Sequence, residues 1–570
     1  MNNTKIKNII ASFFIYISLS FYLNIDYFNI LNIFIFISIF ILFDKFNHFH
    51  SKKNIPLALI LSIFYNVGDI VIKNIYSQTN IFKVIFSFKN LIYFIGLFLI
   101  IQLIVSILIY YLENMKVTSK NNFKNNFKLF LLSFVIIIIL NIPYFMNSYP
   151  GLIAPDSINQ IMQFKHIIPL TDHHPVLHTL FLKLGFKIGE TFSTSENFQA
   201  ACSTIIQMII MASIYSYFIV FLNKKKINKK IIALLIILFG ALPIYAFFSL
   251  SMWKDVLFGG FFLLFVIHLY NLLNMNENIK IRDYLFFIII SLLLLLFRNN
   301  AIYMYILFIP FYLFAFRKKW LPSFISIILV VSCFLMIKYP IYNYYGVERS
   351  KSWEYLGMPI QQVGRMAYKN VNFTEEEKNK IEKFITIDNL KKDYNPIVSD
   401  GIKFSTNLNQ DYFDSHNKSF LLLWKDLVLK HFDIAVESYL VSTVGYWSPN
   451  ISLNAVELGV TNNSINIYNK PLLPKKISKF INGLYNFHIP VLGLQWNLGL
   501  VIWLLLLCGV STYRINKKYF LLFIPSIGMW LTLMLASPVS GMLRYIFWAY
   551  TTLPFYVLLP SIINNKKLKK

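Results

Sequence analysis

Asp156 is the residue whose setting most suggests chemistry. It is the first carboxylate after Glu113, more than forty residues earlier, and it follows a long apolar run within the stretch YPGLIAPDSINQ. Pro155 can take the first position of a helix, which places Asp156 in the first turn, where the helix dipole favours a negative charge. Such a carboxylate can act as a general base, or it can be only a favourable helix-start charge. Its place directly after the apolar run favours the general base.

A second polar group follows in the stretch TDHHP. His174 and His178 are four residues apart, so one helical face could present both to a metal ion, with Asp172 as a third ligand. Pro175 lies between the two histidines, and a metal hydrolase would need a further ligand and a base on the same helix. We therefore expect Asp172, His173 and His174 to hydrogen bond to substrate or within the loop. No metal ligands are predicted, and a divalent cation stays open as a cofactor.

Two cations lie where a bound anion would explain them. Lys254, in SMWKD, and Arg544, in SGMLRY, fall at the starts of apolar helices, near the positive end of the helix dipole. A cation there is unfavourable by about 0.3–1 kcal/mol unless it meets an anion, and one deeper in lipid costs about 2.5–3.5 kcal/mol. Both are predicted to bind a phosphate, the alternative being that they only snorkel to the membrane surface.

Other candidates have weaker support. Arg298 lies at a helix C-terminus, where a cation is welcome in any case, so its expected phosphate contact is less distinctive. Asp255 either binds substrate or caps its helix beside Ser251. Gln160, four residues after Asp156, is predicted to contact substrate.

The elements that position these residues are membrane-spanning helices. Of the 570 residues, 57% are apolar and 14% are charged, and the mean hydropathy of +0.57 lies outside the range of soluble domains. Fourteen segments approach the roughly 18–20 apolar residues that cross a bilayer. The two weakest lie near residues 64 and 309, so we predict about twelve to fourteen transmembrane helices. The centres of the fourteen segments lie near residues 16, 36, 64, 101, 138, 211, 240, 263, 289, 309, 330, 500, 527 and 552.

The net charge of +27 does not indicate a nucleic-acid partner, because lysines and arginines concentrate in short connections such as 224–230 and 317–319. Short basic loops mark the cytoplasmic side, so both termini are predicted to be cytoplasmic in a multi-pass protein of the cell membrane. The alternate connections, including 148–198 and 341–488, then face outward and hold almost all the residues named above. The loop at 73–89 is the weak point, since its lysines would lie outside.

The pattern predicts four parts. Residues 1–115 form a four-span module, 116–340 a transmembrane core with the outer loop 148–198, 341–488 an extracytoplasmic domain, and 489–570 a three-span segment. We call 341–488 the outer domain. It holds 15 of the 26 acidic residues and 17 lysines and arginines, which is typical of a folded, nearly neutral domain.

The outer domain is predicted to be mixed but mainly helical. TEEE at 374–377 forms a capping box, and a long helical pattern runs from about Lys418 to Ser442. Gln361 and Arg365 are candidate sugar contacts, because amides and guanidinium groups bind hydroxyls. They can equally pack the domain onto the spans, as can three further candidates, Gln362, Tyr446 and Trp447.

The outer loop, with its Asp directly after a span and two amphipathic helices, resembles the GT-C class of membrane glycosyltransferases. DHHP at 172–175 is similar to the loop segment of the protein O-mannosyltransferase and aminoarabinose transferase branches. Together with SMWKD, RNN and RY it also resembles an uncharacterised group of bacterial multispanning proteins. The resemblance covers roughly 130–560 and implies that Asp156 is the catalytic base. Four spans precede a loop that usually follows the first span, which leaves 1–115 without a counterpart.

The expected function is therefore sugar transfer from a polyprenyl-phosphate carrier to an extracytoplasmic glycan, lipid or protein acceptor, in contact with membrane lipids. A transporter or flippase of a lipid-linked glycan or anion is the main alternative. It should show inverted repeats with polar groups at the midplane, whereas the polar groups here gather at one membrane face. A glycan polymerase or ligase is a third interpretation, with the same chemistry and a different acceptor.

Overall fold

The structure is a computed structural model that describes residues 3–23, 25, 29, 31–119, 122–275, 278–450, 458–486, 488–537 and 539–567. Helices make up the fold throughout this part of the chain, and the extended segments within it form only isolated β-bridges. The last three residues of the basic tail, 568–570, lie outside the described residues. The all-α, polytopic class predicted from sequence is confirmed.

Ten of the described helices, taken with their flanking turns, are long and apolar enough to cross a membrane, or eleven if the bent pair α10 (Lys229–Ala241) and α11 (Pro243–Leu250) is one span. Side-chain caps start several of them: Asn125 Oδ1 accepts from Lys128 N at α6, for example. The ten are α2 (Leu31–Phe46), α3 (Ile55–Lys73), α5 (Phe88–Asn114), α6 (Asn126–Asn147), α9 (Glu196–Lys224), α12 (Lys254–Met275), α15 (Trp320–Met336), α26 (Leu498–Ile515), α27 (Ile524–Ala536) and α28 (Phe547–Lys567).

The prediction of twelve to fourteen spans is therefore higher than the ten or eleven found. The candidates near 289 and 309 are α13 (Ile281–Phe297), with 17 residues, and α14 (Ala301–Ala315), with 15. Both are short because the turn between them is held inward: Arg298 pairs with Asp255 at 2.8 Å, and Asn299 Nδ2 donates to Asp172 O at 2.9 Å. The candidate near 16 is α1 (Asn3–Leu23), which packs beside α5 but is not among the ten.

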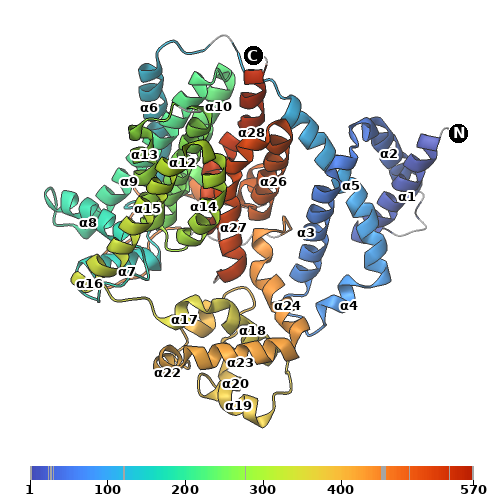
Figure 1. The fold of residues 1–570 in the computed structure, drawn as a ribbon. Coiled ribbons are helices and arrows are strands. Elements are labelled where there is room, and N and C mark those ends of the chain that lie inside the picture. Colours follow the sequence, from blue (N-terminus) through green and yellow to red (C-terminus); the bar gives the residue numbers. More distant parts are fainter. Residues whose placement is uncertain are drawn as a thin grey trace.

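The connections gather at two ends of the bundle. At the end where the chain finishes in Figure 1, Asn228 N donates to Val117 O (2.8 Å) and Asn564 Nδ2 to Glu113 O (2.8 Å). We call this the basic end, because it collects most of the basic stretches. The opposite, site end carries the outer domain. The loop at 73–89 also lies there, because Gln78, within it, donates to Tyr368 O of the outer domain (3.2 Å). The predicted alternation of basic and outward connections puts the loop at 73–89 at this end.

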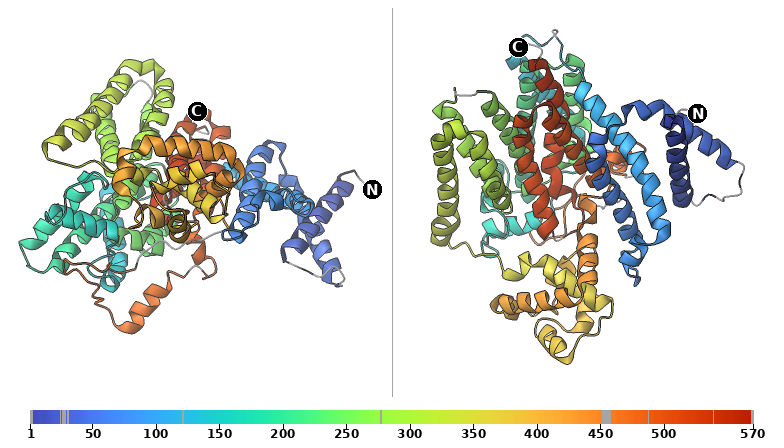
Figure 2. Two further views of the ribbon diagram at one scale, coloured as in Figure 1. Left: turned by 90° about the horizontal axis from the view of Figure 1, so that it is seen from below. Right: turned by 45° about the vertical axis from the view of Figure 1, so that its right-hand side comes forward.

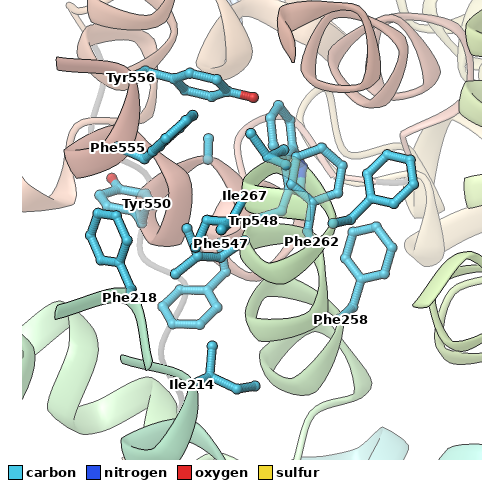
Figure 3. Close-up of a cluster of buried hydrophobic side chains, with 14 of the residues drawn as sticks. Ile214, Phe218, Phe258, Phe262, Ile267, Phe547, Trp548, Tyr550, Phe555 and Tyr556 are labelled. Atoms are coloured by element: carbon cyan, nitrogen blue, oxygen red, sulfur yellow. The ribbon is translucent and has the colours of Figure 1, made fainter. Parts of the chain in front are cut away.

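The core of the bundle is aromatic and lies where α9, α12 and α28 meet (Figure 3). Phe262 of α12 packs against Trp548 of α28 with ring centroids 5.2 Å apart, and Phe218 of α9 contacts Phe555 at 6.4 Å. Within their spanning windows, α12 and α28 are each 83% buried, whereas α2 is 11% buried. Thus α12 and α28 are the central helices, and α1 and α2 stand at the edge of the molecule (Figure 1).

The outer domain stands below the bundle in Figure 1 and is mainly helical. The capping box is confirmed at Thr374 and Glu377, at the start of α19. The continuous helix predicted from Lys418 to Ser442 is wrong, because His431 divides it. The helices are α17 (Ser352–Tyr355), α18 (Gly357–Tyr368), α19 (Glu375–Glu382), α20 (Ile387–Asp393), α21 (Asp400–Lys403), α22 (Gln410–Ser415), α23 (Asn417–Lys430) and α24 (Phe432–Thr443). A further helix of the range 341–488, α25 (Lys475–Gly483), lies apart from these and contacts the end of α6.

The outer loop contains the two predicted amphipathic helices. They are α7 (Pro155–Phe164), with Pro155 at its first position and Asp156 in its first turn, and α8 (Val176–Glu190). Leu180 and Leu184 of α8 are each more than half exposed, on the face that the spacing predicts to be apolar. This exposure is what a helix at a membrane surface requires.

Candidate functional site

The segments that lead into α7 and α12 run side by side at the site end. Leu152 N donates to Leu250 O (3.1 Å), and Met252 N donates to Leu152 O (3.0 Å). Because both segments run straight into a helix, the first turns of α7 and α12 are neighbours. This arrangement brings Asp156 of α7 close to Lys254 of α12, although the two are distant in sequence.

Asp156 pairs with Arg544, which lies in the turn Leu543–Ile546 just before α28. Arg544 Nη1 donates to Asp156 Oδ2 at 2.6 Å, and the Asp156 side chain is 28% exposed. Oδ1 of Asp156 accepts no hydrogen bond from any described residue. Asp156 is therefore more than an unpaired helix-start charge, the alternative that the sequence left open: one oxygen is held by a cation and the other is available.

Arg544 is held in a fixed orientation between two rings. Its guanidinium lies 5.2 Å from the Trp253 ring centroid and 5.0 Å from that of Tyr545. Nη2 donates to Tyr545 Oη (3.2 Å), and Nε points at Met542 Sδ (3.1 Å). Since a guanidinium has five N–H groups and three are used, two stay available for a further acceptor.

Trp253 supplies an unused donor at the same place. Its side chain is 3% exposed and lines the cavity described below, yet its Nε1–H has no hydrogen-bond partner among the described residues. A buried donor without a partner costs about 1–3 kcal/mol. An acceptor that reached this donor would relieve that cost.

His174 and Lys254 complete the group. Lys254 Nζ lies 3.3 Å from His174 Nδ1, so the lysine donates and the histidine carries its proton on Nε2. Burial, and then the charge of Lys254, hold the pKa of His174 well below its usual value, so the ring is neutral. His174 Nδ1 is 4.0 Å from Asp156 Oδ2.

The electrostatics keep Asp156 ionised. Its burial favours the neutral acid, but the charges of Arg544 and Lys254, with the hydrogen bond from Arg544, outweigh burial and hold the pKa of Asp156 far below its usual range. The nearest charges are three cations, Lys254, Arg544 and Arg298, against the two carboxylates of Asp156 and Asp255. In this buried group the cations outnumber the carboxylates by three to two, and Asp156 and Arg544 are its members that line the cavity described below.

A cavity of about 530 Å³ lies between the bundle and the outer domain, and Asp156 opens into it. Its volume is within the range of small-ligand pockets. The bundle contributes residues from α7, the loop before α8 and the starts of α12 and α28. The lining residues from this side include Asp156, Asn159, Gln163, Thr171, His173, His174, Trp253, Met542 and Arg544.

The outer domain forms the opposite wall, and this wall is acidic. Glu348, Glu354, Asp400 and Phe404 line it. Glu354 also pairs with Nδ1 of His173, so the two walls touch through this contact. The cavity thus has the pair of Asp156 and Arg544 on the bundle side and three carboxylates on the outer-domain side.

Asp172 is bound entirely by protein groups. Its Oδ1 accepts from Ser350 N at 2.7 Å, its Oδ2 lies 3.3 Å from Lys338 Nζ, and its N donates to Glu348 O at 2.8 Å. The sequence left open whether Asp172 hydrogen bonds to substrate or within the loop, and the structure shows hydrogen bonds within the fold. It fixes the loop that carries His173 and His174.

Asp255 and Arg298 form an ion pair with each other behind the cavity. Arg298 Nη1 lies 2.8 Å from Asp255 Oδ1, with side chains 6% and 1% exposed, and it also donates to Tyr545 O (3.1 Å). Neither residue lines the cavity, and Asp255 makes no capping bond with Ser251, whose hydroxyl donates to Phe247 O. The pair joins α12 to the turn before α28 and so positions Lys254 and Arg544.

Three further candidates also lie away from the cavity. Gln160 is buried, donating from Nε2 to Thr179 Oγ1 (2.9 Å) and accepting at Oε1 from His178 Nδ1 (2.9 Å), which ties α7 to α8. Gln361 donates to Asn395 O (2.8 Å) inside the outer domain. Arg365 is fully buried against Glu437. The structure does not bring these three to the site, and Gln362, Tyr446 and Trp447 are likewise buried in packing contacts.

Sequence reasoning missed Trp253 and the acidic wall. Trp253 stands inside the quoted motif SMWKD, directly before Lys254, and an aromatic next to a charged helix start was a usable signal. Glu348, Glu354 and Asp400 gave no signal, because their approach to Asp156 depends on how the outer domain docks.

No group of three or more His, Cys, Asp or Glu side chains that could hold a metal ion occurs within the described ranges. His174 and His178 do not form a pair of ligands, since His178 Nδ1 is bonded to Gln160 and His174 Nδ1 faces Lys254.

Residues 162–569 match a family of unknown function (DUF6020), and because the match covers more than half of the chain, the chain belongs to that family. The matched part contains Asp172, Lys254 and Arg544 and begins just after Asp156. No curated protein and no solved structure matches the chain.

Proposed function

We propose that this multi-pass membrane protein is a glycosyltransferase that moves a sugar from a polyprenyl-phosphate carrier to an acceptor on the extracytoplasmic face. One observation carries the proposal: a carboxylate with a free oxygen, Asp156, opens into a sugar-sized cavity that is also lined by Arg544, which has two unused N–H groups. A lipid-linked donor needs these groups together at the end of a helix bundle, where its phosphate would lie at the membrane surface.

The reaction is an inverting displacement. The acceptor hydroxyl oxygen forms a bond to the anomeric carbon, the bond from that carbon to the phosphate oxygen breaks, and the electron pair leaves with the polyprenyl phosphate. The acceptor proton passes to Asp156 Oδ1 and then to water. Arg544, Lys254 and the Trp253 N–H stabilise the charge that develops on the phosphate.

Arg544 would change partner during the cycle. In the resting site its charge keeps the pKa of Asp156 low, which makes the carboxylate a poor base. A bound phosphate competes for the same guanidinium, and each hydrogen bond it takes from Asp156 raises the basicity of the carboxylate. Donor binding therefore prepares the base, so the proton is taken only when a donor is present.

The orientation in the membrane follows the basic loops. We place both termini and the basic end on the cytoplasmic side and the cavity outside. The outer domain, which forms the acidic wall, then supplies the acceptor side of the site, while the bundle binds the donor. Acceptors are a glycan, a lipid or a protein of the cell envelope.

The test compares cells carrying the native chain, Asp156→Asn, Asp156→Glu or no protein, with envelope glycans and lipid-linked sugars profiled by mass spectrometry. We expect one sugar to disappear from a glycan, and its lipid-linked donor to accumulate, in the Asn variant and the deletion. The Glu variant keeps a carboxylate and should restore part of the transfer.

Asp426→Asn is the matched control, because it makes the same change on an exposed helix of the outer domain. Replacing the carboxylate by an amide removes the negative charge opposite Arg544, at a cost of about 1–3 kcal/mol, so the amount and thermal midpoint of each purified variant are measured alongside. Native glycans in a well-folded Asn variant would refute the assignment of Asp156. A deletion that leaves all envelope glycans unchanged would favour a transporter, and lengthened or shortened polymers would favour a polymerase or ligase.

A further inference from the structure

We propose that α25, together with the segment before it, is a binding site for the headgroups of anionic phospholipids in the membrane leaflet at the site end. The proposal concerns a surface outside the cavity and does not depend on the reaction proposed above. It is carried by the position of α25 at the end of a span, by its two-sided character and by its charge.

The position of α25 is fixed by hydrogen bonds to the end of α6. Asn147, the last residue of α6, donates from Nδ2 to Asn482 Oδ1 at 2.8 Å. Just before α25, Leu472 N donates to Met146 O (2.8 Å) and Lys470 N donates to Tyr149 O (2.9 Å). Because α6 is a membrane span, its end marks the boundary between the hydrocarbon and the headgroups, and α25 lies at that level.

The helix projects sideways from the bundle. Seen from the side of the outer domain, α25 is the dark orange helix at the lower edge of the molecule (Figure 2, left). Only its inner edge is packed, through Ile481, which is 5% exposed. The remaining faces are directed at the surroundings of the bundle, which in a membrane are lipid and headgroups.

The two faces of α25 differ completely in polarity. Ile477 and Phe480 lie on the same side as buried Ile481, yet they are 47% and 67% exposed. Two large apolar side chains left in water would be unfavourable, whereas at the acyl boundary they are buried. Exposed lysines occupy the opposite side: Lys475, Lys476 and Lys479.

The charge identifies the lipid. Residues 458–486 contain four lysines and no Asp or Glu, and no ion pair involving the three lysines of α25 occurs among the described residues. A basic amphipathic helix at the membrane surface gains affinity from each Lys that meets an anionic headgroup, about fivefold per residue. Zwitterionic lipid offers no such gain, so the site selects acidic headgroups.

The experiment places a fluorophore on α25 in the full chain, reconstituted in lipid nanodiscs. Phe480→Cys is labelled with nitrobenzoxadiazole and tested for quenching by lipids with a spin label on the acyl chain. Leu422→Cys is the matched control, since Leu422 is similarly exposed (64%) but lies on α23 of the outer domain. The native cysteines are first removed as Cys202→Ser, Cys333→Ser and Cys508→Ala.

We expect strong quenching at position 480 and little at 422. Adding phosphatidylglycerol to phosphatidylcholine discs should increase quenching at 480, and changing the three lysines of α25 to Gln should raise the phosphatidylglycerol fraction needed by fivefold or more. Changing Lys383, Lys418 and Lys425 of the outer domain to Gln should have no effect.

Equal quenching at 480 and 422 would overturn the proposal, and would mean that the apolar face covers protein, such as a second copy of the chain. Quenching at 480 that does not respond to phosphatidylglycerol, or that responds equally in the triple variant, would overturn the assignment to anionic headgroups.

Discussion

Around Asp156, individual side chains are held by contacts that reach far along the sequence. His178 is an example: its side chain is completely buried between α7 and α8, and its Nδ1–H donates to Gln160 Oε1. Burial first, and the charge of Lys254 second, lower the pKa of His178 to about 3. The histidine is therefore neutral wherever the protein is folded at ordinary pH.

This gives a pH-dependent stability. In the unfolded chain His178 has a pKa of about 6.5. Below that pH the unfolded state therefore binds a proton at His178 that the folded state does not bind. The stabilisation is complete above about pH 6.5 and decreases by up to about 1.4 kcal/mol per pH unit as the pH falls toward 3. We predict a falling thermal midpoint over this range for the purified chain.

His178→Asn should lessen the slope by up to about 1.4 kcal/mol per pH unit, because Asn keeps a donor for Gln160 and does not titrate in this range. His174, whose pKa is also held low, keeps its own share of the slope in this variant. His416→Asn, at an exposed histidine, is the control and should leave the slope unchanged. A slope in His178→Asn that equals the slope of the native chain would contradict the prediction and assign the effect to other groups.

Among the elements, the short connection from α6 to α7 determines where Asp156 stands. Gly151 has φ +147°, a conformation that L side chains rarely adopt, and a Cβ atom there would overlap Thr204 Oγ1, which itself donates to Pro150 O (2.9 Å). The chain therefore turns at Gly151 in the one way that brings Leu152 alongside the segment before α12.

We predict that Gly151→Ala destabilises the fold by about 1–3 kcal/mol, because it adds both backbone strain and an overlap. Gly346→Ala is the matched control: its φ is +64°, but no atom lies near the added Cβ. A lower thermal midpoint for Gly151→Ala than for Gly346→Ala isolates the overlap. Equal midpoints would show that α7 can shift without cost.

Some helices could be predicted from the local sequence and others could not, for a physical reason. Pro155 and the apolar spacing of α8 were sufficient to place the helices of the outer loop, because these signals act within a few residues. The sequence around His431 contains no Gly or Pro that would predict the break there. It lets α23 lie along the outer domain while α24 rises toward the bundle (Figure 1), a choice made by packing.

The candidate site divides in the same way. Asp156, Lys254 and Arg544 were predicted, because a charge beside an apolar run is conspicuous, and the structure brings these three together. Arg365 was equally conspicuous as a charge and proved to be a packing residue, since the sequence does not show that Glu437 lies opposite. The acidic wall of the cavity could not be predicted either, because the sequence does not show which residues of the outer domain lie opposite Asp156.

At the scale of the whole molecule, a buried charge cluster docks the outer domain on the N-terminal spans. Arg365 pairs with Glu437 and donates from Nη1 to Ile75 O (2.6 Å), and Lys369 Nζ lies 2.7 Å from the same carboxylate. Glu437 Oε2 also accepts from Ile81 N (3.3 Å). Residues 1–115, whose purpose the sequence left open, thus support the domain that closes the cavity.

We predict that Arg365→Met loosens this docking, because breaking a buried ion pair costs about 3–5 kcal/mol. Amide hydrogen exchange should increase in α18 and α24 and in the loop 74–80, while the central spans α12 and α28 stay protected. Lys378→Met breaks an exposed pair with Glu375 and should change nothing measurable. Unchanged exchange in α18 would show that other contacts suffice.

The ion pair between Asp156 and Arg544 joins residues 388 positions apart, and this spacing has a consequence for how the protein is made. Asp156 is synthesised early and waits at the membrane surface while the outer domain and the last spans emerge. Its partner arrives only when α28 has entered the bilayer. A nascent or truncated chain that lacks α28 therefore holds half of the candidate site, and Asp156 meets Arg544 only once α28 has been inserted.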